Sequence, residues 1–220
     1  PGATPGNPRL WWLDPLSGAA APLYDNSQEL GLAARFSPDS RWLAFVAALG
    51  RGIRVVNLEN GENRLIASEV GSPPAWSPDS GQLALTDIKL ENDVWAVHVF
   101  LADPAEGEPV DLTQDIEMDD NSPAWSPDGE WIAVARKGSR DTAGRQLWRL
   151  RPDGSQAQAL TAEGDFHHGG PAWSPDGRTL LFQRTSLTDP GAMPSIWVLD
   201  VATGETRQIA PAGTQPAWLP

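Results

Sequence analysis

Short apolar runs follow one another along this chain of 220 residues, and turn-forming residues separate them. Each run is about four residues long, and Gly, Pro, Asn or Asp stands between consecutive runs. Strands of that length with such boundaries are typical of all-β proteins, whereas a helix needs a longer segment with a 3.6-residue period. No segment combines helical periodicity with sufficient length and freedom from Gly and Pro, so the sequence predicts almost no helix.

One motif, Pro-Ala-Trp-Ser-Pro-Asp followed by Gly or Ser, groups these runs into repeats. Complete copies begin at Pro74, Pro123 and Pro171, a diverged copy covers 34–40, and a shortened copy covers 216–220. The aromatic residue of the motif recurs at intervals of 40, 49, 48 and 45 residues, at Phe36, Trp76, Trp125, Trp173 and Trp218. A period of that size with several short strands per unit is the signature of a β-propeller.

Each repeat reads as four antiparallel strands, which we name a to d in chain order. Strand a contains Pro-Ala-Trp, and Ser-Pro-Asp-Gly forms the turn to strand b because Pro presets φ while Ser and Asp bond to nearby backbone. The predicted strands b, apolar on both faces, are 42–45, 82–85, 131–134 and 179–182. The predicted strands c are 53–56, 94–97, 147–150 and 196–199, and strands d are 63–66, 109–112, 157–160 and 207–210.

Tryptophan and aspartate recur at equivalent positions of the repeat, which favours a structural role for both. Besides the motif aromatics, the second position of strand c holds Trp11, Trp95, Trp148 and Trp197. An aromatic ring repeated in every blade indicates packing between blades rather than sugar stacking, because each ring can bury about 150–250 Å². We interpret the aspartates of the a–b turns as structural for the same reason; they are Asp39, Asp79, Asp128 and Asp176.

The predicted fold is an all-β propeller of antiparallel four-stranded blades, five in number, in a single domain over residues 9–220. Residues 9–24 read as strands c and d, and 216–220 as strand a, so we expect these N- and C-terminal strands to close one composite blade. That blade shows no obvious strand b, so it is either three-stranded or completed by chain beyond Pro220. The other blades cover about 33–67, 73–113, 122–161 and 170–210.

The Ala-Trp-Ser-Pro-Asp-Gly string and the hairpin from Ile196 to Gly204 resemble the WD-like repeat of the periplasmic translocation protein TolB and its relatives. The resemblance covers residues 9–220. TolB itself has a further N-terminal domain and usually one more blade, so its particular partners are not carried over. The same repeats occur in prolyl-oligopeptidase-type peptidases and in surface-exposed bacterial proteins. The resemblance implies a scaffold that binds proteins or peptides, periplasmic or extracellular, and it does not imply a reaction.

Residues 1–8 form a Pro/Gly/Thr stretch without a Met, which is typical of a linker. We therefore expect an anchor, a signal or a further domain upstream.

Alternating strands place the b–c and d–a connections on one face of the ring. The longer, dissimilar connections belong to that face: 25–33, 86–93, 114–122, 137–146, 162–170 and 186–195. Long loops on a rigid scaffold are where binding usually resides, so we predict the functional surface there.

Charged residues on these connections are the candidate interaction residues: Glu117, Asp119, Asp120, Arg136, Lys137, Arg140, His167 and His168. Carboxylates and imidazoles of adjacent blades would converge near the channel mouth, and both bind divalent ions. The candidates for such a metal site are Asp119, Asp120, His167 and His168. The opposing interpretation is that they are solvated loop residues. The basic segment 136–151 either balances the acidic residues 111–130 or docks an acidic peptide, and we favour the first because exposed charge runs usually only solvate a face.

Composition excludes several classes of function. Lys and Arg number 16 against 29 Asp and Glu, and the net charge of −13 disfavours binding to nucleic acid or to an anionic membrane surface. The chain has no cysteine, which rules out disulfides and thiolate zinc sites, and no apolar run is long enough for membrane insertion. It contains no nucleophile elbow, zinc-protease motif, phosphate loop or dinucleotide fingerprint.

Three functions remain, and we favour a non-catalytic scaffold that binds a protein or peptide and is tethered to an upstream domain. The second is a regulatory or gating propeller of a larger enzyme, such as a prolyl-oligopeptidase-type peptidase. The third is a sensor of a metal or small ligand at the channel mouth. A glycosidase would need carboxylates in the channel, and its candidates are Glu117, Asp119, Asp120 and Asp165. No catalytic residue and no cofactor are assigned, apart from the divalent cation considered above.

Overall fold

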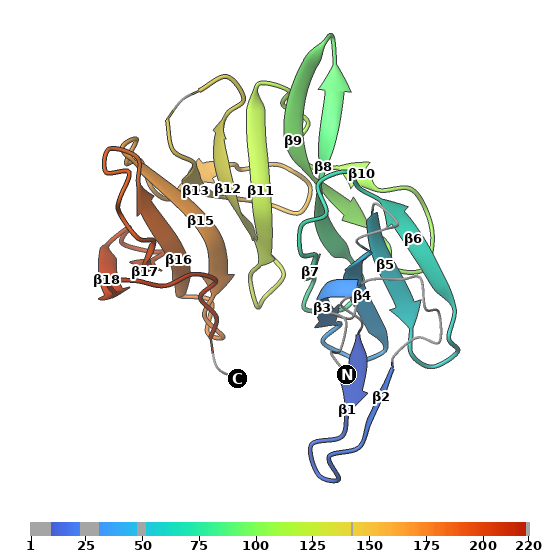
Figure 1. The fold of residues 1–220 in the computed structure, drawn as a ribbon. Coiled ribbons are helices and arrows are strands. Elements are labelled where there is room, and N and C mark those ends of the chain that lie inside the picture. The colour runs from blue at the N-terminus through green and yellow to red at the C-terminus, as the bar shows by residue number, and fades with distance from the viewer. Residues whose placement is uncertain (1–9, 23–30, 48–51, 142, 219–220) are drawn as a thin grey trace, which may run out of the picture.

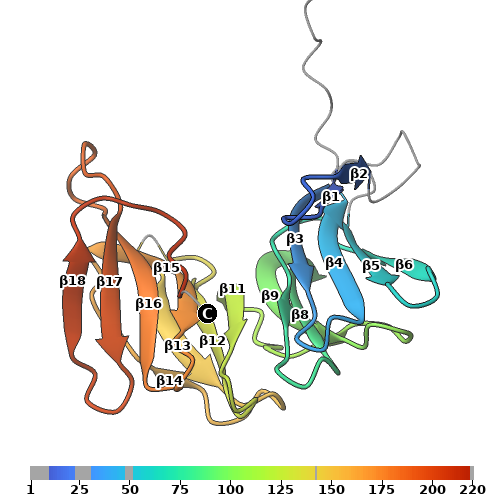
Figure 2. The ribbon, with the colours of Figure 1, turned by 90° about the horizontal axis from the view of Figure 1, so that it is seen from below.

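The computed structural model describes residues 10–22, 31–47, 52–141 and 143–218, and these form five antiparallel sheets. The sheets follow one another in chain order around an arc (Figures 1 and 2). This arrangement confirms the predicted all-β propeller class. No helix in the described ranges is long and apolar enough to cross a membrane. The predicted linker, residues 1–8, lies outside the described residues.

The first sheet pairs β1 (Trp11–Leu13) with β2 (Ala20–Pro22). Blade 1 consists of β3 (Gly31–Phe36), β4 (Trp42–Ala47), β5 (Gly52–Asn57) and β6 (Asn63–Ala67). Blade 2 consists of β7 (Ala75–Trp76), β8 (Leu83–Glu91), β9 (Val94–Ala102) and β10 (Val110–Asp111). Blade 3 consists of β11 (Met118–Trp125), β12 (Ile132–Gly138), β13 (Gln146–Leu150) and β14 (Gln158–Ala159). Blade 4 consists of β15 (Phe166–Trp173), β16 (Thr179–Ser186), β17 (Ser195–Asp200) and β18 (Thr206–Ala210).

The hydrophobic cores lie between neighbouring blades. Alternate side chains of a strand point to opposite faces, so each strand b packs on the preceding blade with one set and on the next blade with the other. Ala44 and Val46 of β4 thus contact the cluster that contains Leu83 and Leu85 of β8. Equivalent clusters join blade 2 to blade 3 and blade 3 to blade 4. This two-sided burial explains why the strands b carry apolar residues on both faces where they lie between blades.

The a–b turns are closed by the serine and aspartate of the repeat. Ser37 Oγ donates to Asp39 Oδ1 at 2.6 Å and accepts from the Trp42 backbone N at 2.9 Å. Donation from the serine hydroxyl holds the pKa of the Asp39 carboxyl below its usual value. The same bond closes the other three turns, in Ser77–Asp79, Ser126–Asp128 and Ser174–Asp176. Ser40 and Ser80 follow in the left-handed region at φ 61° and 64°, where the other two repeats use Gly, as at Gly129 with φ 72°.

The tryptophans of the strand-a position tie each blade to the one before it. An indole Nε1 donates to the carbonyl of the residue that precedes the aromatic of the previous blade. These pairs, each at 3.0 Å, are Trp76 with Arg35, Trp173 with Ala124 and Trp218 with Ala172. Trp125 differs, because its buried Nε1 has no hydrogen-bond partner in the described structure. Trp218 therefore docks on blade 4 as the strand-a tryptophan of a further blade would.

The arc is not closed by pairing of its ends. β1 pairs with β2 alone, and Pro216–Trp218 joins none of the described strands although Trp218 is docked. Among the described strands, none of blade 4 contacts blade 1 or the β1–β2 sheet, and blade 4 and the β1–β2 sheet lie on either side of the opening (Figure 1). The predicted composite blade is thus not one sheet in the described residues, because no strand b lies between its two halves.

Blade 2 differs from the prediction in the length of its central hairpin. β8 and β9 run past the ring and are joined by Asn92 and Asp93 alone, with φ of 50° and 62°. Two consecutive positive φ angles form a tight hairpin turn, which Asn and Asp tolerate better than other residues with side chains. Residues 86–93, predicted as an irregular loop, are therefore mostly strand.

The position of Trp95 in the core was predicted wrongly. β8 pairs with β9 so that Leu83 lies opposite Ala102, and this register places Phe100 at the position equivalent to Trp148 and Trp197. Phe100 accordingly packs against the core between blades 1 and 2. Trp95 lies beyond that core, near the tip of the hairpin, and is 64% exposed.

Candidate functional site

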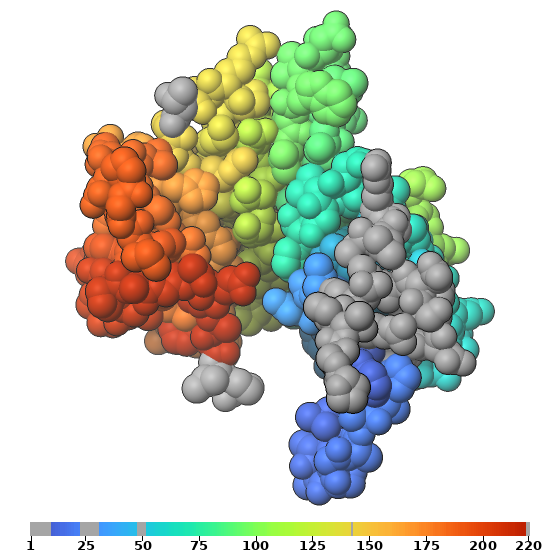
Figure 3. Space-filling view, viewed as in Figure 1, coloured from blue at the N-terminus to red at the C-terminus, as the bar shows by residue number. Residues whose placement is uncertain are grey.

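The β8–β9 hairpin forms a two-stranded ribbon that stands out from the ring (Figure 1, green). The β12–β13 connection projects on the same side, which is the face of the b–c connections (Figures 1 and 3). The sequence predicts the functional surface on this face, but from irregular loops rather than from a ribbon. The ribbon is the most prominent feature that the structure adds to it.

One side of the ribbon carries an apolar stripe, which we define as Ile88, Leu90, Trp95 and Val97. Leu90 lies opposite Trp95, and Ile88 lies opposite Val97, so the four side chains share one side of the ribbon. Ile88, Leu90 and Trp95 are 38%, 50% and 64% exposed. Val99, two residues further on the same side, is buried against blade 3. The stripe therefore continues the core between blades 2 and 3 outward into solvent.

A charged cluster lies at the foot of the stripe. Asp119 of β11 accepts a hydrogen bond from the backbone N of Val97 at 2.9 Å, which fixes the ribbon to blade 3. The other Asp119 oxygen lies 3.9 Å from Lys137 Nζ and 3.7 Å from an Arg145 terminal nitrogen. Asp119 is predicted on a loop, but β11 begins at Met118, so the carboxylate projects from a strand opposite Lys137.

Asp120 and Arg136 form a buried ion pair across β11 and β12. The guanidinium donates two hydrogen bonds to the carboxylate, at 2.7 and 2.8 Å, and Asp120 is fully buried. Further along the same basic segment, Arg149 and Arg151 stack over the ring of Trp131 at 4.3 and 4.1 Å. Most of the basic segment is thus engaged within the blade.

His168 of β15 is a buried, uncharged histidine. Its Nδ1 lies 2.8 Å from Thr161 Oγ1, and its ring packs edge-on to Phe182 at 5.0 Å. Burial, and then the positive charge of Arg184, lower the pKa of His168 to about 4. Glu163 lies 3.4 Å from His168 Nε2 but binds Arg184 at 2.8 Å, so its charge is already compensated and does not raise that pKa.

Arg145 connects the strands a of blades 3 and 4. Its side chain donates to the carbonyl of Asp119 at 2.8 Å, and its backbone N donates to His167 Nδ1 at 3.4 Å. Burial, then the positive charges of Arg145 and Lys137, lower the pKa of His167. Among the described residues, no group of three or more His, Asp or Glu is placed to hold a metal ion. The predicted metal candidates bind cations, a hydroxyl and backbone N–H groups rather than one another.

The remaining candidates lie at the edge of this region. Glu117 and Arg140 are exposed, on the connections before β11 and after β12. Asp165 is exposed just before β15. Sequence reasoning missed the apolar stripe, although a signal for it exists: Asn92-Asp93 stands between the alternating segment Ile88 to Glu91 and the apolar segment Val94 to Val97, which is a hairpin pattern.

Comparison with known proteins agrees with this architecture. The profile of the family described as the TolB beta propeller domain matches residues 16–220. TolB from Acinetobacter baumannii has a similar structure, with a TM-score of 0.67 at 18% identity over 95% of this chain and 50% of that chain. Oligogalacturonate lyase from Vibrio parahaemolyticus gives a TM-score of 0.69 at 17% identity, over 92% of this chain and 58% of that chain. No curated protein sequence is significantly similar to this chain.

These structural similarities show the fold alone, because the sequence identities are below 20%. The chain spans half the length of the Acinetobacter TolB and 58% of the Vibrio lyase. A TolB protein and a lyase are thus built on the same scaffold. The choice between a catalytic and a non-catalytic role therefore depends on the side chains of this chain.

Proposed function

The chain belongs to the TolB β-propeller domain family, and we propose that it is a non-catalytic scaffold that binds a protein or peptide partner through the face of its b–c and d–a connections. The observation that carries this proposal is the exposed apolar stripe on the β8–β9 ribbon, defined above. Tryptophan is among the residues that dominate the energy of interfaces, and it does so from rigid, well-supported positions. The paired ribbon, which Asp119 fixes to blade 3, presents Trp95 to solvent and fits that requirement.

The charged cluster supports binding rather than chemistry at this face. Asp119 is fixed by a backbone N–H and by two cations, and Asp120 is saturated by Arg136. A general acid or base needs a side chain free to exchange its proton with a substrate. These carboxylates instead hold the ribbon and blade 3 in fixed positions, so a partner meets a preorganised surface.

We propose a periplasmic or extracellular location, with the domain tethered through its N-terminal side. The resemblance of the repeats to those of TolB supports the location. The family's use in larger proteins supports the tether, and the Vibrio lyase shows that such a protein can be an enzyme. The fold therefore leaves a gating role within a larger enzyme as an alternative, which the ribbon does not favour.

The test removes the stripe without disturbing the fold. A Leu90→Ser and Trp95→Ser double variant changes two exposed side chains, so thermal unfolding should stay close to that of the wild type. Partners captured by the wild-type domain from extracts of its source organism should lose at least tenfold in yield with the double variant, as measured by quantitative mass spectrometry.

The matched control is Leu16→Ser, which removes an apolar side chain that is 96% exposed, away from the ribbon. It should retain the same partners. Retention by the double variant, or an equal loss with Leu16→Ser, would place the binding surface elsewhere.

A further inference from the structure

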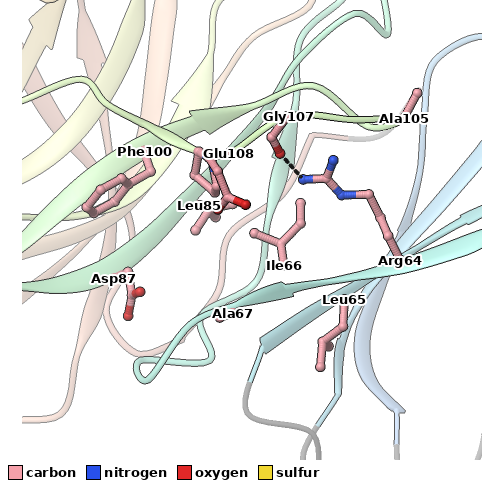
Figure 4. A pocket seen from close by; sticks show the side chains of 11 residues that line it. Arg64, Leu65, Ile66, Ala67, Leu85, Asp87, Phe100, Ala105, Gly107 and Glu108 are labelled. Atoms are coloured by element: carbon pink, nitrogen blue, oxygen red, sulfur yellow. Dashed lines mark hydrogen bonds between the residues drawn. The ribbon is translucent and has the colours of Figure 1, made fainter.

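A groove separates blades 1 and 2 at the outer rim of the ring (Figure 4). Its volume is about 780 Å³, which is within the usual range of about 300–1,000 Å³ for ligand sites. Apolar side chains line its floor: Ile66 from β6, Leu85 from β8 and Phe100 from β9. The groove is distinct from the ribbon stripe, because that stripe faces blade 3.

The groove runs along the free edge of β6. Four successive residues, 64–67, line it. Successive residues of a strand point to opposite sides, so only the backbone edge can present all four to one cavity. β6 is the last strand of its sheet, and its outer backbone groups have no strand partner among the described strands. An edge of this kind accepts an additional strand from another chain.

Two carboxylates give the groove a negative charge. Asp87 is held in place because its Oδ1 accepts hydrogen bonds from the backbone N of Glu69 at 2.7 Å and of Ile88 at 2.8 Å. Glu108 is exposed, and its carboxylate has no hydrogen bond or ion pair with any described residue. Arg64 lies at the same rim, where its guanidinium donates to the carbonyl of Gly107 at 2.8 Å. No ion pair joins Arg64 to Asp87 or Glu108 among the described residues, and two carboxylates against one guanidinium leave the lining with a net negative charge.

We propose that this groove binds an extended basic segment of a partner protein. The segment pairs with the free edge of β6, places an apolar side chain against Phe100 and directs a Lys or Arg side chain toward Asp87 and Glu108. An apolar floor beside two carboxylates suits these side chains, because their aliphatic stems pack on apolar surface while the charge stays at the rim. The net charge of −13 attracts such a segment from a distance.

The probe is a fluorescein-labelled heptapeptide in which Lys alternates with Val and Leu, and the comparison peptide has Glu in place of Lys. Fluorescence anisotropy measures affinity, and amide chemical shifts locate the bound peptide. We expect the Lys peptide to bind, with the largest shift changes at residues 64–67, and the Glu peptide not to bind. Ala105→Trp should abolish binding because the new ring fills the groove, which Ala105 lines.

The matched pair of variants separates a specific contact from diffuse attraction. Glu108→Gln removes a carboxylate that lines the groove, and Glu106→Gln removes one from the same connection that does not line it. Affinity for the Lys peptide should fall about fivefold with Glu108→Gln, the upper range for an exposed ion pair, and should hardly change with Glu106→Gln. Equal effects of the two changes, or binding of the Glu peptide, would overturn the proposal.

The outcome is independent of the function proposed for the ribbon. The Leu90→Ser and Trp95→Ser double variant should bind the Lys peptide as the wild type does. If that variant loses the peptide, the peptide binds the ribbon, and the groove is not its site. If the Lys peptide does not bind the groove while the ribbon variant still loses its partners, the proposed function remains and only the second site is rejected.

Discussion

Two tryptophans at the same position of the repeat, Trp125 and Trp173, differ in whether the indole N–H makes a hydrogen bond. Trp173 donates to the carbonyl of Ala124, whereas the buried Nε1 of Trp125 has no partner in the described structure. Replacing Trp by Phe removes the donor in both cases, but only Trp173→Phe breaks a bond, and a hydrogen bond contributes about 1 kcal/mol net. Trp173→Phe should therefore lower the free energy of unfolding by about 1 kcal/mol more than Trp125→Phe, measured in urea. Equal losses would show that the Trp125 donor is satisfied in solution.

Protonation of His168 makes stability depend on pH in a defined window. Its pKa is about 4 in the folded protein against 6.5 ordinarily, so the unfolded chain takes up the proton first as pH falls. Protonation of this histidine should lower the free energy of unfolding by roughly 2 kcal/mol between pH 7 and pH 4.5. His168→Gln should remove that loss, measured as the difference in urea unfolding between variant and wild type at the two pH values.

Other titrating groups do not account for the difference in pH dependence between His168→Gln and the wild type. His98 has a raised pKa: burial opposes the shift, but Asp111, which binds its Nδ1 at 2.9 Å, outweighs that opposition. Its contribution has the opposite sign, because it is present at low pH and is lost as pH rises through the folded pKa. The turn aspartates, such as Asp39, have lowered pKa values and lose their contribution only below the window. All of these groups are present in both proteins and cancel in the difference.

At the scale of elements, the turn of the β8–β9 ribbon decides how firmly Trp95 is presented. Asp93 has φ 62°, which glycine adopts without strain and a β-branched residue adopts at a cost of about 1–2 kcal/mol. Asp93→Gly should slow amide exchange in the ribbon several-fold, and Asp93→Val should accelerate it. Exchange in β12 should not change in either variant, and it serves as the internal reference. Unchanged ribbon exchange would show that the turn does not control opening of the hairpin.

The repeat makes the blades predictable because its information is local. The Ser–Asp bond of each a–b turn and the apolar strand after it depend on residues within six positions, as in Ser37 to Trp42. The position of Trp95 depends instead on register. Its local sequence resembles that of Trp148, and only the pairing of Leu83 with Ala102 shows that it lies beyond the core.

The candidate site was harder to predict for a related reason. Asp119 and Asp120 belong to residue types that are rare in strands, so the segment reads as a loop. β11 nevertheless begins at Met118, because a bulge beyond Asn121 lets this polar part pair with β12. Once it is paired, Asp120 lies opposite Arg136, and the ion pair follows. The candidate residues were thus identified, while their partners required the register.

At the scale of the whole molecule, the open arc predicts uneven stability. Among the described strands, those of each blade contact only neighbouring blades and those of blade 4 do not contact blade 1, so stability should behave as a sum of blade and interface terms along a line. β8 and β12 lie in blades with a four-stranded neighbour on both sides, whereas β4 and β16 lie in the end blades. Native-state amide exchange should therefore give β8 and β12 the highest opening free energies, and β4 and β16 values lower by a few kcal/mol. A closed ring would make the four strands equivalent, so equal values would mean that the ends associate in solution and that the molecule unfolds as one cooperative unit.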